Sequence, residues 1–136
     1  MPEHTGISAR YGGHVDLGVT TDKVPGGWLV EVSGEIDLHT APALRAALDS
    51  AVAEAAAASP GGADVLVDLS GVGFMDSTGL GELVGAHKAL GRAGGRLHLV
   101  VTSDRVARLL SLTGLDEVLD VHRDRDAGLG TLAQRG

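Results

Sequence analysis

Segments of two kinds alternate along the chain, and this alternation constrains the fold more than any other feature of the sequence. Apolar stretches at 28–32, 65–69 and 97–101 have the length and the Val/Leu content of β-strands and are bounded by turn residues. Between them, apolar residues recur at helical spacing over 41–58 and 80–90. Because strands that alternate with helices pair mainly in parallel, the sequence predicts an α/β domain with a mixed, mostly parallel sheet of four to five strands.

The two ends of the chain extend this pattern. An apolar/polar alternation over 15–19 is separated from the strand at 28–32 by a Pro-Gly-Gly turn, which predicts an N-terminal β-hairpin. Toward the other end, the sequence predicts a third helix over 103–114, a short edge strand over 117–122 and a weak fourth helix over 126–135. About four helices are therefore expected to pack on the sheet.

A single domain is expected, because 136 residues match the size of one ordinary domain. The polar, glycine-bearing residues 1–12 predict a flexible N-terminal tail. The domain itself is expected over 13–132, with 133–136 as a C-terminal tail. Since the chain has only three aromatic residues, Leu, Val and Ala must supply most of the core.

Composition excludes several classes of function. The absence of cysteine rules out disulfides, thiolate metal sites and cysteine catalysis, and it fits a cytoplasmic protein. No apolar run approaches the roughly 20 residues that span a bilayer, and the N-terminus has no apolar signal region, so no membrane partner is expected. A net charge of -7 argues against nucleic acid as a partner. A monomer is expected, because no long apolar surface stripe is evident.

The sequence GFMDSTGLGE, at 73–82, lies where the central strand gives way to the second helix. It does not match the known phosphate-binding loops. A P-loop requires a Gly-Lys pair, which the chain lacks, and a dinucleotide fingerprint that starts at Gly71 would place Asp76 where its third glycine belongs. A carboxylate at that point would repel a pyrophosphate, so cofactor binding is disfavoured.

A serine hydrolase and a receiver domain are disfavoured as well. In a hydrolase with Ser77 as nucleophile, Met75 would stand where the nucleophile elbow has its first glycine. His87, which falls on or beside the apolar stripe of the second helix, is a poor base for a triad. A receiver domain with Asp68 as phosphoacceptor would need a late lysine, and no lysine follows Lys88.

Two interpretations of Ser77 remain from residue chemistry. In the first, Asp76, Ser77 or Thr78 only caps the helix, and the nearby glycines permit a sharp turn. In the second, Ser77 accepts a phosphoryl group, which a helix N-terminus tolerates because it favours anions. Together with Asp76, Glu35 and Asp37, a phosphate would make this patch strongly negative toward a partner. The two interpretations are compatible, and residue chemistry alone favours the cap.

Two motifs in the chain resemble those of the anti-sigma factor antagonists of bacteria, which are members of the STAS-domain family. They are GEIDLHTA at 34–41 and VLVDLSGVGFMDSTGLGELV at 65–84, in this order and at this spacing. The later segment RLHLVVTSDRVARLLSLTGLDEVLDVH at 96–122 is similar to the strand, third helix and closing segment of that family. The resemblance covers roughly residues 13 to 132 and implies the STAS fold.

The resemblance implies a function without catalysis. Such a protein binds an anti-sigma factor that is also a serine kinase of the GHKL type, and in its unphosphorylated form it frees a sigma factor. The kinase would phosphorylate Ser77, the complex would fall apart, and a PP2C-type phosphatase would reset it. ATP and Mg²⁺ belong to the kinase, so no cofactor is expected in this chain. The partner-binding residues implied by the resemblance are Glu35, Asp37, Thr40, Asp76, Thr78, Gly79, Leu80 and Gly81.

Two alternatives accompany this expectation. Thr78 stands where many relatives have serine and offers a second hydroxyl beside Ser77. The family also contains STAS domains that serve as scaffolds or sensors, so a non-phosphorylated scaffold or nucleotide-sensing interaction module is the alternative function. The acid and hydroxyl at 76–77 favour the phosphorylated branch.

Overall fold

The computed structural model describes residues 4–11, 14–59 and 61–135 and shows one sheet covered by helices on its two faces. The strands, in their spatial order, are β1 (His4–Tyr11), β2 (His14–Val24), β3 (Gly27–Ile36), β4 (Asp64–Met75), β5 (Leu97–Val100) and β6 (Asp120–His122). The helices are α1 (Ala41–Ala58), α2 (Ser77–Arg92), α3 (Asp104–Leu112), the short 3₁₀ helix η1 (Leu115–Glu117) and α4 (Arg125–Arg135).

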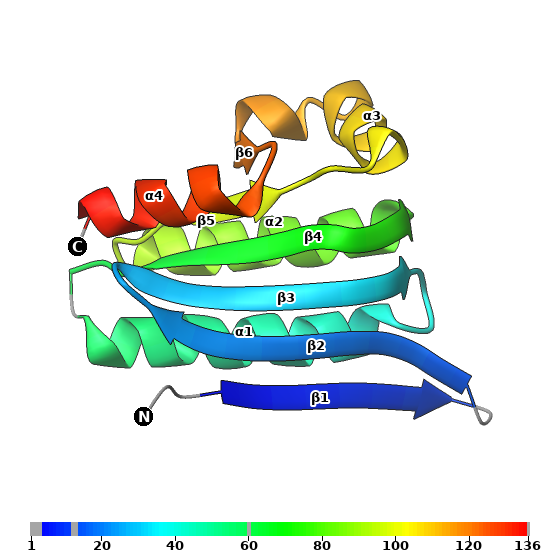
Figure 1. Ribbon diagram of the computed structural model, residues 1–136, viewed down its shortest axis with the longest axis horizontal. Helices are drawn as coiled ribbons and strands as arrows, with labels where there is room; N and C mark the ends of the chain where they lie inside the picture. The colour runs from blue at the N-terminus through cyan, green and yellow to red at the C-terminus, as the bar shows by residue number, and fades with distance from the viewer. Residues whose placement is uncertain (1–3, 12–13, 60, 136) are drawn as a thin grey trace.

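The sheet is mixed, as the sequence predicts. The pairs β1–β2 and β2–β3 are antiparallel, whereas β3, β4, β5 and β6 run in parallel and are joined by α1, α2 and α3. In Figure 1, α1 and α2 lie behind the sheet and α4 crosses the opposite face. The α/β class, the hairpin β2–β3 and the four helices are thus confirmed, and the sheet has six strands where four to five were expected, because β1 pairs with β2.

Strand β1 differs from the expectation of a tail over 1–12. His4–Tyr11 pairs along β2, from His4 opposite Asp22 to Tyr11 opposite His14. The physical reason is the length of β2, which at 11 residues has an edge of backbone groups that a further strand can pair. Residues 1–3 and 12 lie outside the described residues. At the other end, the expected tail at 133–136 is helical as far as Arg135.

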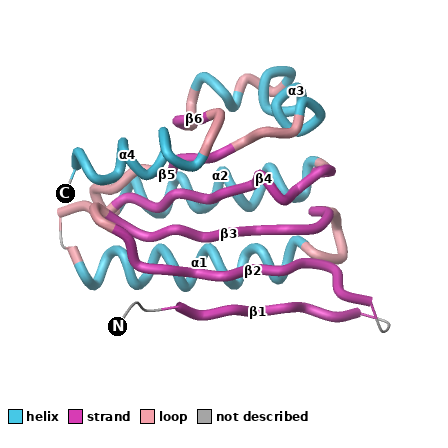
Figure 2. Tube along the Cα trace, viewed as in Figure 1, coloured by secondary structure: helices cyan, strands magenta, loops and turns pink. Residues whose placement is uncertain are grey.

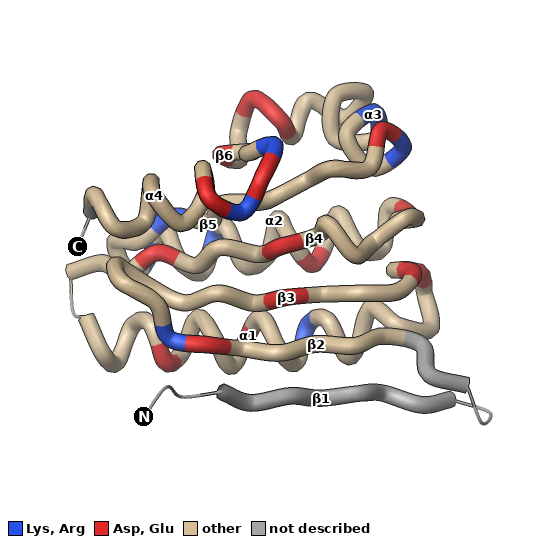
Figure 3. Tube along the Cα trace, in the orientation of Figure 1, with Lys and Arg blue, Asp and Glu red and all other residues tan. Residues whose placement is uncertain are grey.

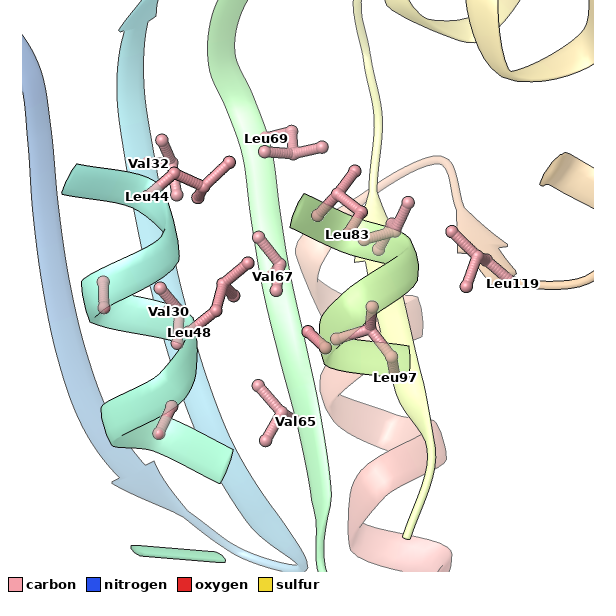
Figure 4. Packing of buried hydrophobic residues seen from close by; sticks show 14 of the residues in the cluster. Val30, Val32, Leu44, Leu48, Val65, Val67, Leu69, Leu83, Leu97 and Leu119 are labelled. Atoms are coloured by element: carbon pink, nitrogen blue, oxygen red, sulfur yellow. The ribbon is translucent and has the colours of Figure 1, made fainter. Parts of the chain in front are cut away.

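The main core lies between the sheet and the helices α1 and α2. Alternate residues of the central strands point toward these helices, and Figure 4 shows β3 and β4 contributing Val30, Val32, Val65, Val67 and Leu69. The intervening residues of the strands face α4, where a smaller cluster contains Leu29, Leu66, Val100 and Leu132. Strand β4 is therefore buried on both faces along its first half, which fixes its register in the sheet.

Arg125 fastens the start of α4 to the sheet. Its Nε donates to Asp68 Oδ2 at 2.8 Å, and its Nη2 donates to Glu31 Oε2 at 2.5 Å. The other carboxylate oxygen of Asp68 accepts from the backbone N–H of Ser70 at 2.9 Å. Burial acts to raise the pKa of Asp68, but the hydrogen bonds from Ser70 and Arg125 outweigh it and leave that pKa below its ordinary value. This carboxylate therefore holds α4 in place as an anion.

Two histidines on the same side of the sheet as α4 form a second polar contact. His98 is 1% exposed, and its Nε2 lies 2.8 Å from Asp64 Oδ2. Its Nδ1 lies 3.4 Å from Nε2 of His122, whose ring stacks on that of His98. Burial and the neighbouring His98 lower the pKa of His122, and these causes outweigh the nearby carboxylates of Asp120 and Asp124. His122 is therefore held as a neutral base in the folded protein.

We expect the free energy of unfolding to fall as the pH decreases from 7 to 5, with His122 as one cause. Because the folded pKa of His122 lies below its ordinary value of 6.5, the unfolded chain takes up a proton that the folded protein excludes. This contribution is complete above pH 6.5 and is lost as the pH falls below that value. Urea denaturation at the two pH values should show a smaller loss for His122→Gln than for the wild type. Equal losses would contradict the prediction.

Candidate functional site

The two motifs singled out in the sequence meet at one edge of the sheet. Strands β3 and β4 are parallel neighbours, and their last residues, Ile36 and Met75, are paired. The backbone N–H of Asp76 donates to the carbonyl of Ile36 at 3.1 Å, which joins the loop after β3 to the start of α2. Figure 2 shows both strands ending at the right-hand edge of the sheet, where α1 and α2 begin. The loop at 37–40 and the helix start at Ser77 are therefore neighbours.

Ser77 is the first residue of α2, and its side chain is exposed. The preceding residue, Asp76, is the N-cap: its Oδ1 accepts from the backbone N–H of Thr78 at 2.9 Å. Of the three residues considered for the cap, Asp76 thus fulfils this role. Since the cap is supplied by its neighbour, Ser77 presents its hydroxyl to solvent at the positive end of the helix dipole.

The surface around Ser77 is acidic. Figure 3 shows acidic positions at the right-hand ends of β3 and β4, where Glu35, Asp37 and Asp76 lie. Glu35 is exposed, and the other two are partly exposed. A phosphate on Ser77 would add roughly -1.5 to -2 charges to this surface. The N-terminus of α2 would stabilise the phosphate in this chain. A partner protein that approaches this surface would meet the phosphate together with the three carboxylates.

The loop after β3 is fastened by its own polar groups. Oδ1 of Asp37 accepts from the backbone N–H groups of His39 at 2.9 Å and Thr40 at 3.1 Å. The hydroxyl of Thr40 donates to the carbonyl of Glu35 at 2.8 Å and accepts from the N–H of Asp37 at 2.9 Å. The hydrogen bond from the Thr40 N–H is the main reason that the pKa of Asp37 lies below its ordinary value. Asp37 is thus an anion that closes the loop.

The eight residues implied as partner contacts divide by burial. Five of them are at least partly exposed at this edge, namely Glu35, Asp37, Asp76, Thr78 and Gly81. The other three are buried, with Thr40 2% and Leu80 6% exposed and Gly79 packed under the helix. The buried residues can affect a partner only through the shape that they impose on the loop and the helix.

Gly79 is required by close packing. A Cβ atom at this position would lie 2.5 Å from Cγ2 of Ile36 and 2.8 Å from Cγ of Met75, distances that real Cβ atoms do not show. The glycine therefore lets α2 start directly against the ends of β3 and β4. Gly81, one half-turn further on, is exposed, and a Cβ there would meet nothing within 4 Å. Within one motif, Gly79 is thus closely packed and Gly81 is open to solvent.

The alternative chemistries do not fit the geometry. His87, the base considered for a hydrolase, follows Ser77 by ten residues on α2, which is about 15 Å along the helix at 1.5 Å per residue. His87 is therefore too far from Ser77 to act as its base. Asp68 is buried and engaged by Arg125, so a receiver-type phosphoacceptor is not available there. The glycines at 71 and 73 lie inside β4 rather than in a loop that could hold a phosphate.

Within 4–11, 14–59 and 61–135, no group of three or more His, Asp or Glu side chains is arranged to hold a metal ion. No helix in the described part of the chain is both long enough and apolar enough to cross a membrane.

Sequence reasoning missed Leu38, which lies in the loop between β3 and α1. Its side chain is 69% exposed, and over the side chains described at 17–59 and 61–134 only Leu112 and Val118 are also large, apolar and exposed. The available signal was a single leucine between Asp37 and His39, which continues the apolar alternation of the preceding strand two residues beyond Ile36. That signal is weak, because single exposed leucines are common on protein surfaces.

Comparisons with known proteins agree with the resemblance. The sequence profile of the STAS domain matches residues 19–128. The anti-sigma-B factor antagonist of Bacillus subtilis (strain 168) is 38% identical over 100 residues, which make up 74% of this chain and 85% of that protein. The anti-sigma-B factor antagonist of Staphylococcus aureus (strain NCTC 8325 / PS 47) is 39% identical over 93 residues, 68% of this chain and 81% of that protein.

A solved structure is similar over almost the whole chain. The crystal structure of an anti-sigma factor antagonist from Mycobacterium paratuberculosis superposes with a TM-score of 0.69 and 30% sequence identity. The match covers 96% of this chain and 94% of that one.

Proposed function

The chain belongs to the STAS domain family, and we propose that it is an anti-sigma factor antagonist whose binding is switched off by phosphorylation of Ser77. In its unphosphorylated form it binds an anti-sigma factor and thereby frees a sigma factor for transcription. The anti-sigma factor is a serine kinase of the GHKL type, and a PP2C-type phosphatase removes the phosphate. The protein acts in the cytoplasm as a monomer and carries out no catalysis of its own.

One observation carries this proposal: Ser77 is exposed at the first position of α2, while Asp76 supplies the helix cap. A serine that is not needed as a cap, at a site that favours anions, suits a phosphoacceptor. The relatives of 38% and 39% identity that are named anti-sigma-B factor antagonists support the choice of partner.

The proposed modification transfers the γ-phosphoryl group of ATP bound to the kinase. The Oγ atom of Ser77 forms the new P–O bond, the bond between the γ-phosphorus and its bridging oxygen breaks, and ADP leaves. The hydroxyl proton passes to a base of the kinase. In this chain, the phosphate lies near the first-turn N–H groups of α2, so the fold persists. The partner meets a surface that already carries Glu35, Asp37 and Asp76, so the complex dissociates.

Phosphorylation by a candidate anti-sigma kinase tests the proposal. We expect incubation with the kinase and Mg-ATP to add one phosphoryl group, which intact-mass spectrometry detects and peptide mapping assigns to Ser77. The phosphate should be acid-stable and base-labile, as a serine ester is. Ser77→Ala should take up no phosphate and should still bind the kinase.

Thr78→Val is the matched control, because it removes the neighbouring hydroxyl and leaves Ser77 in place. This variant should be phosphorylated like the wild type. Phosphate on Thr78 or Asp68, with Ser77→Ala still labelled, would overturn the assignment of Ser77. Stable binding of an anti-sigma factor with no phosphorylation under any condition would favour the non-phosphorylated scaffold instead.

A further inference from the structure

Leu38 exposes a large apolar side chain beside the acceptor serine. It follows Asp37 in the loop after β3, whose last residue, Ile36, accepts a hydrogen bond from the N–H of Asp76. With 69% of its surface exposed, Leu38 packs little against this chain, although leucine gains from burial. Its exposure therefore contributes nothing to the stability of the fold.

The loop holds Leu38 in a fixed position. Residues on both sides are tied to each other, because Oδ1 of Asp37 accepts from the N–H groups of His39 and Thr40. The N–H of Ala41 donates to the carbonyl of Asp37 at 2.8 Å, and the hydroxyl of Thr40 reaches back to Glu35 at 2.8 Å. An apolar side chain on an ordered loop can bind a partner at low entropic cost, because the loop is already arranged.

The surroundings of Leu38 have the layout of an interface centre. The residues next to it in the chain, Asp37 and His39, are polar and at least partly exposed, and Glu35, three residues before it, is also exposed. Ser77 and Asp76 lie across the β3–β4 pair. Protein interfaces commonly place one or a few apolar side chains inside a polar rim, and truncating a residue at the centre of an interface can weaken binding more than tenfold.

We propose that Leu38 is the apolar anchor of the interface with the anti-sigma factor and that Asp37 and Thr40 are positioning residues that hold it there. This inference rests on the proposed function and names the contact through which the partner is bound. The anti-sigma factor receives Leu38 in an apolar pocket next to the site that binds Ser77. The hydrogen bonds of Asp37 are directed into the loop itself, so its carboxylate serves the partner through the loop geometry.

Truncation of Leu38 tests the anchor. We expect Leu38→Ala to raise the Kd for the anti-sigma kinase at least tenfold, as hot-spot residues do, and to leave the melting temperature unchanged because the side chain is exposed. The controls are Leu112→Ala and Val118→Ala, whose side chains are 74% and 57% exposed on α3 and before β6. They should change the Kd less than threefold. A change below threefold for Leu38→Ala as well would overturn the proposal.

A double-mutant cycle tests Thr40 as a positioning residue. Thr40→Val removes the hydroxyl that bonds Glu35 and Asp37, whereas Thr40→Ser keeps it. We expect Thr40→Val to weaken binding of the anti-sigma kinase in the wild-type background, whereas Thr40→Ser should bind like the wild type. In the Leu38→Ala background, Thr40→Val should weaken binding little further. Fully additive effects of the two substitutions would show that Thr40 acts independently of Leu38.

Failure of this inference is distinguishable from failure of the proposed function. If Ser77→Asp weakens binding but Leu38→Ala does not, the anchor assignment is wrong and the phosphorylation switch stands. If the wild type binds no anti-sigma kinase, the proposed function and the inference both fall.

Discussion

The Ser77→Asp variant is expected to bind the anti-sigma kinase about a hundredfold more weakly than the wild type, a loss of about 3 kcal/mol. The substitution places a permanent negative charge at the first position of α2, next to Asp76 and near Glu35 and Asp37. The fold should tolerate it, because an acidic residue in the first turn of a helix is favourable by about 0.3–1 kcal/mol. Isothermal titration calorimetry would give the Kd, and thermal denaturation would show an unchanged or slightly raised melting temperature.

Ser77→Asn is the matched control for this experiment. Asparagine has nearly the shape of aspartate and no charge, so it should weaken binding much less. The difference between the two variants should shrink as ionic strength rises, since exposed charges are screened over about 10 Å at 0.1 M salt. Equal losses for Asn and Asp would mean that size at this position, rather than charge, blocks the partner.

The Gly79→Ala variant is expected to lose about 1–3 kcal/mol of unfolding free energy. Its added methyl group would lie 2.5 Å from Cγ2 of Ile36, a side chain that is fully buried and cannot yield easily. The helix start would then have to move away from the ends of β3 and β4. Because that movement also shifts Ser77 and Asp76, phosphorylation of the variant should be slower. Urea denaturation and a phosphorylation time course measure the two effects.

Gly81→Ala provides the matched comparison within the same motif. A Cβ at this position meets nothing within 4 Å, and alanine favours a helix over glycine by about 0.5–1 kcal/mol. This variant should therefore be more stable than the wild type, in contrast to Gly79→Ala. The same sign of change in both variants would contradict the packing argument.

The helices and the central strands could be predicted from the sequence because their signals are local. Apolar spacing alone located α1 and α2, and the alternation at 97–101 located β5. The lengths of the strands were less predictable. The predicted strand at 65–69 continues in the structure to Met75, and its pairing with β3 has two irregularities. The polar and glycine residues at 70–73 concealed this continuation. β1 pairs with β2, the next strand along the chain, and the polar, glycine-bearing composition of 1–12 concealed this pairing.

In the candidate site, too, local features could be predicted from the sequence and contacts between distant segments could not. The sequence by itself placed Ser77 at a helix start, because a strand, an N-capping acid and a helical pattern follow one another there. Only the tertiary structure decided which neighbours this serine has. The parallel pairing of β3 with β4 brings the loop at 37–40 beside it, closes that loop through Asp37 and Thr40, and leaves Leu38 exposed. Local periodicity carries no information on these contacts, since they join segments about 40 residues apart in the chain.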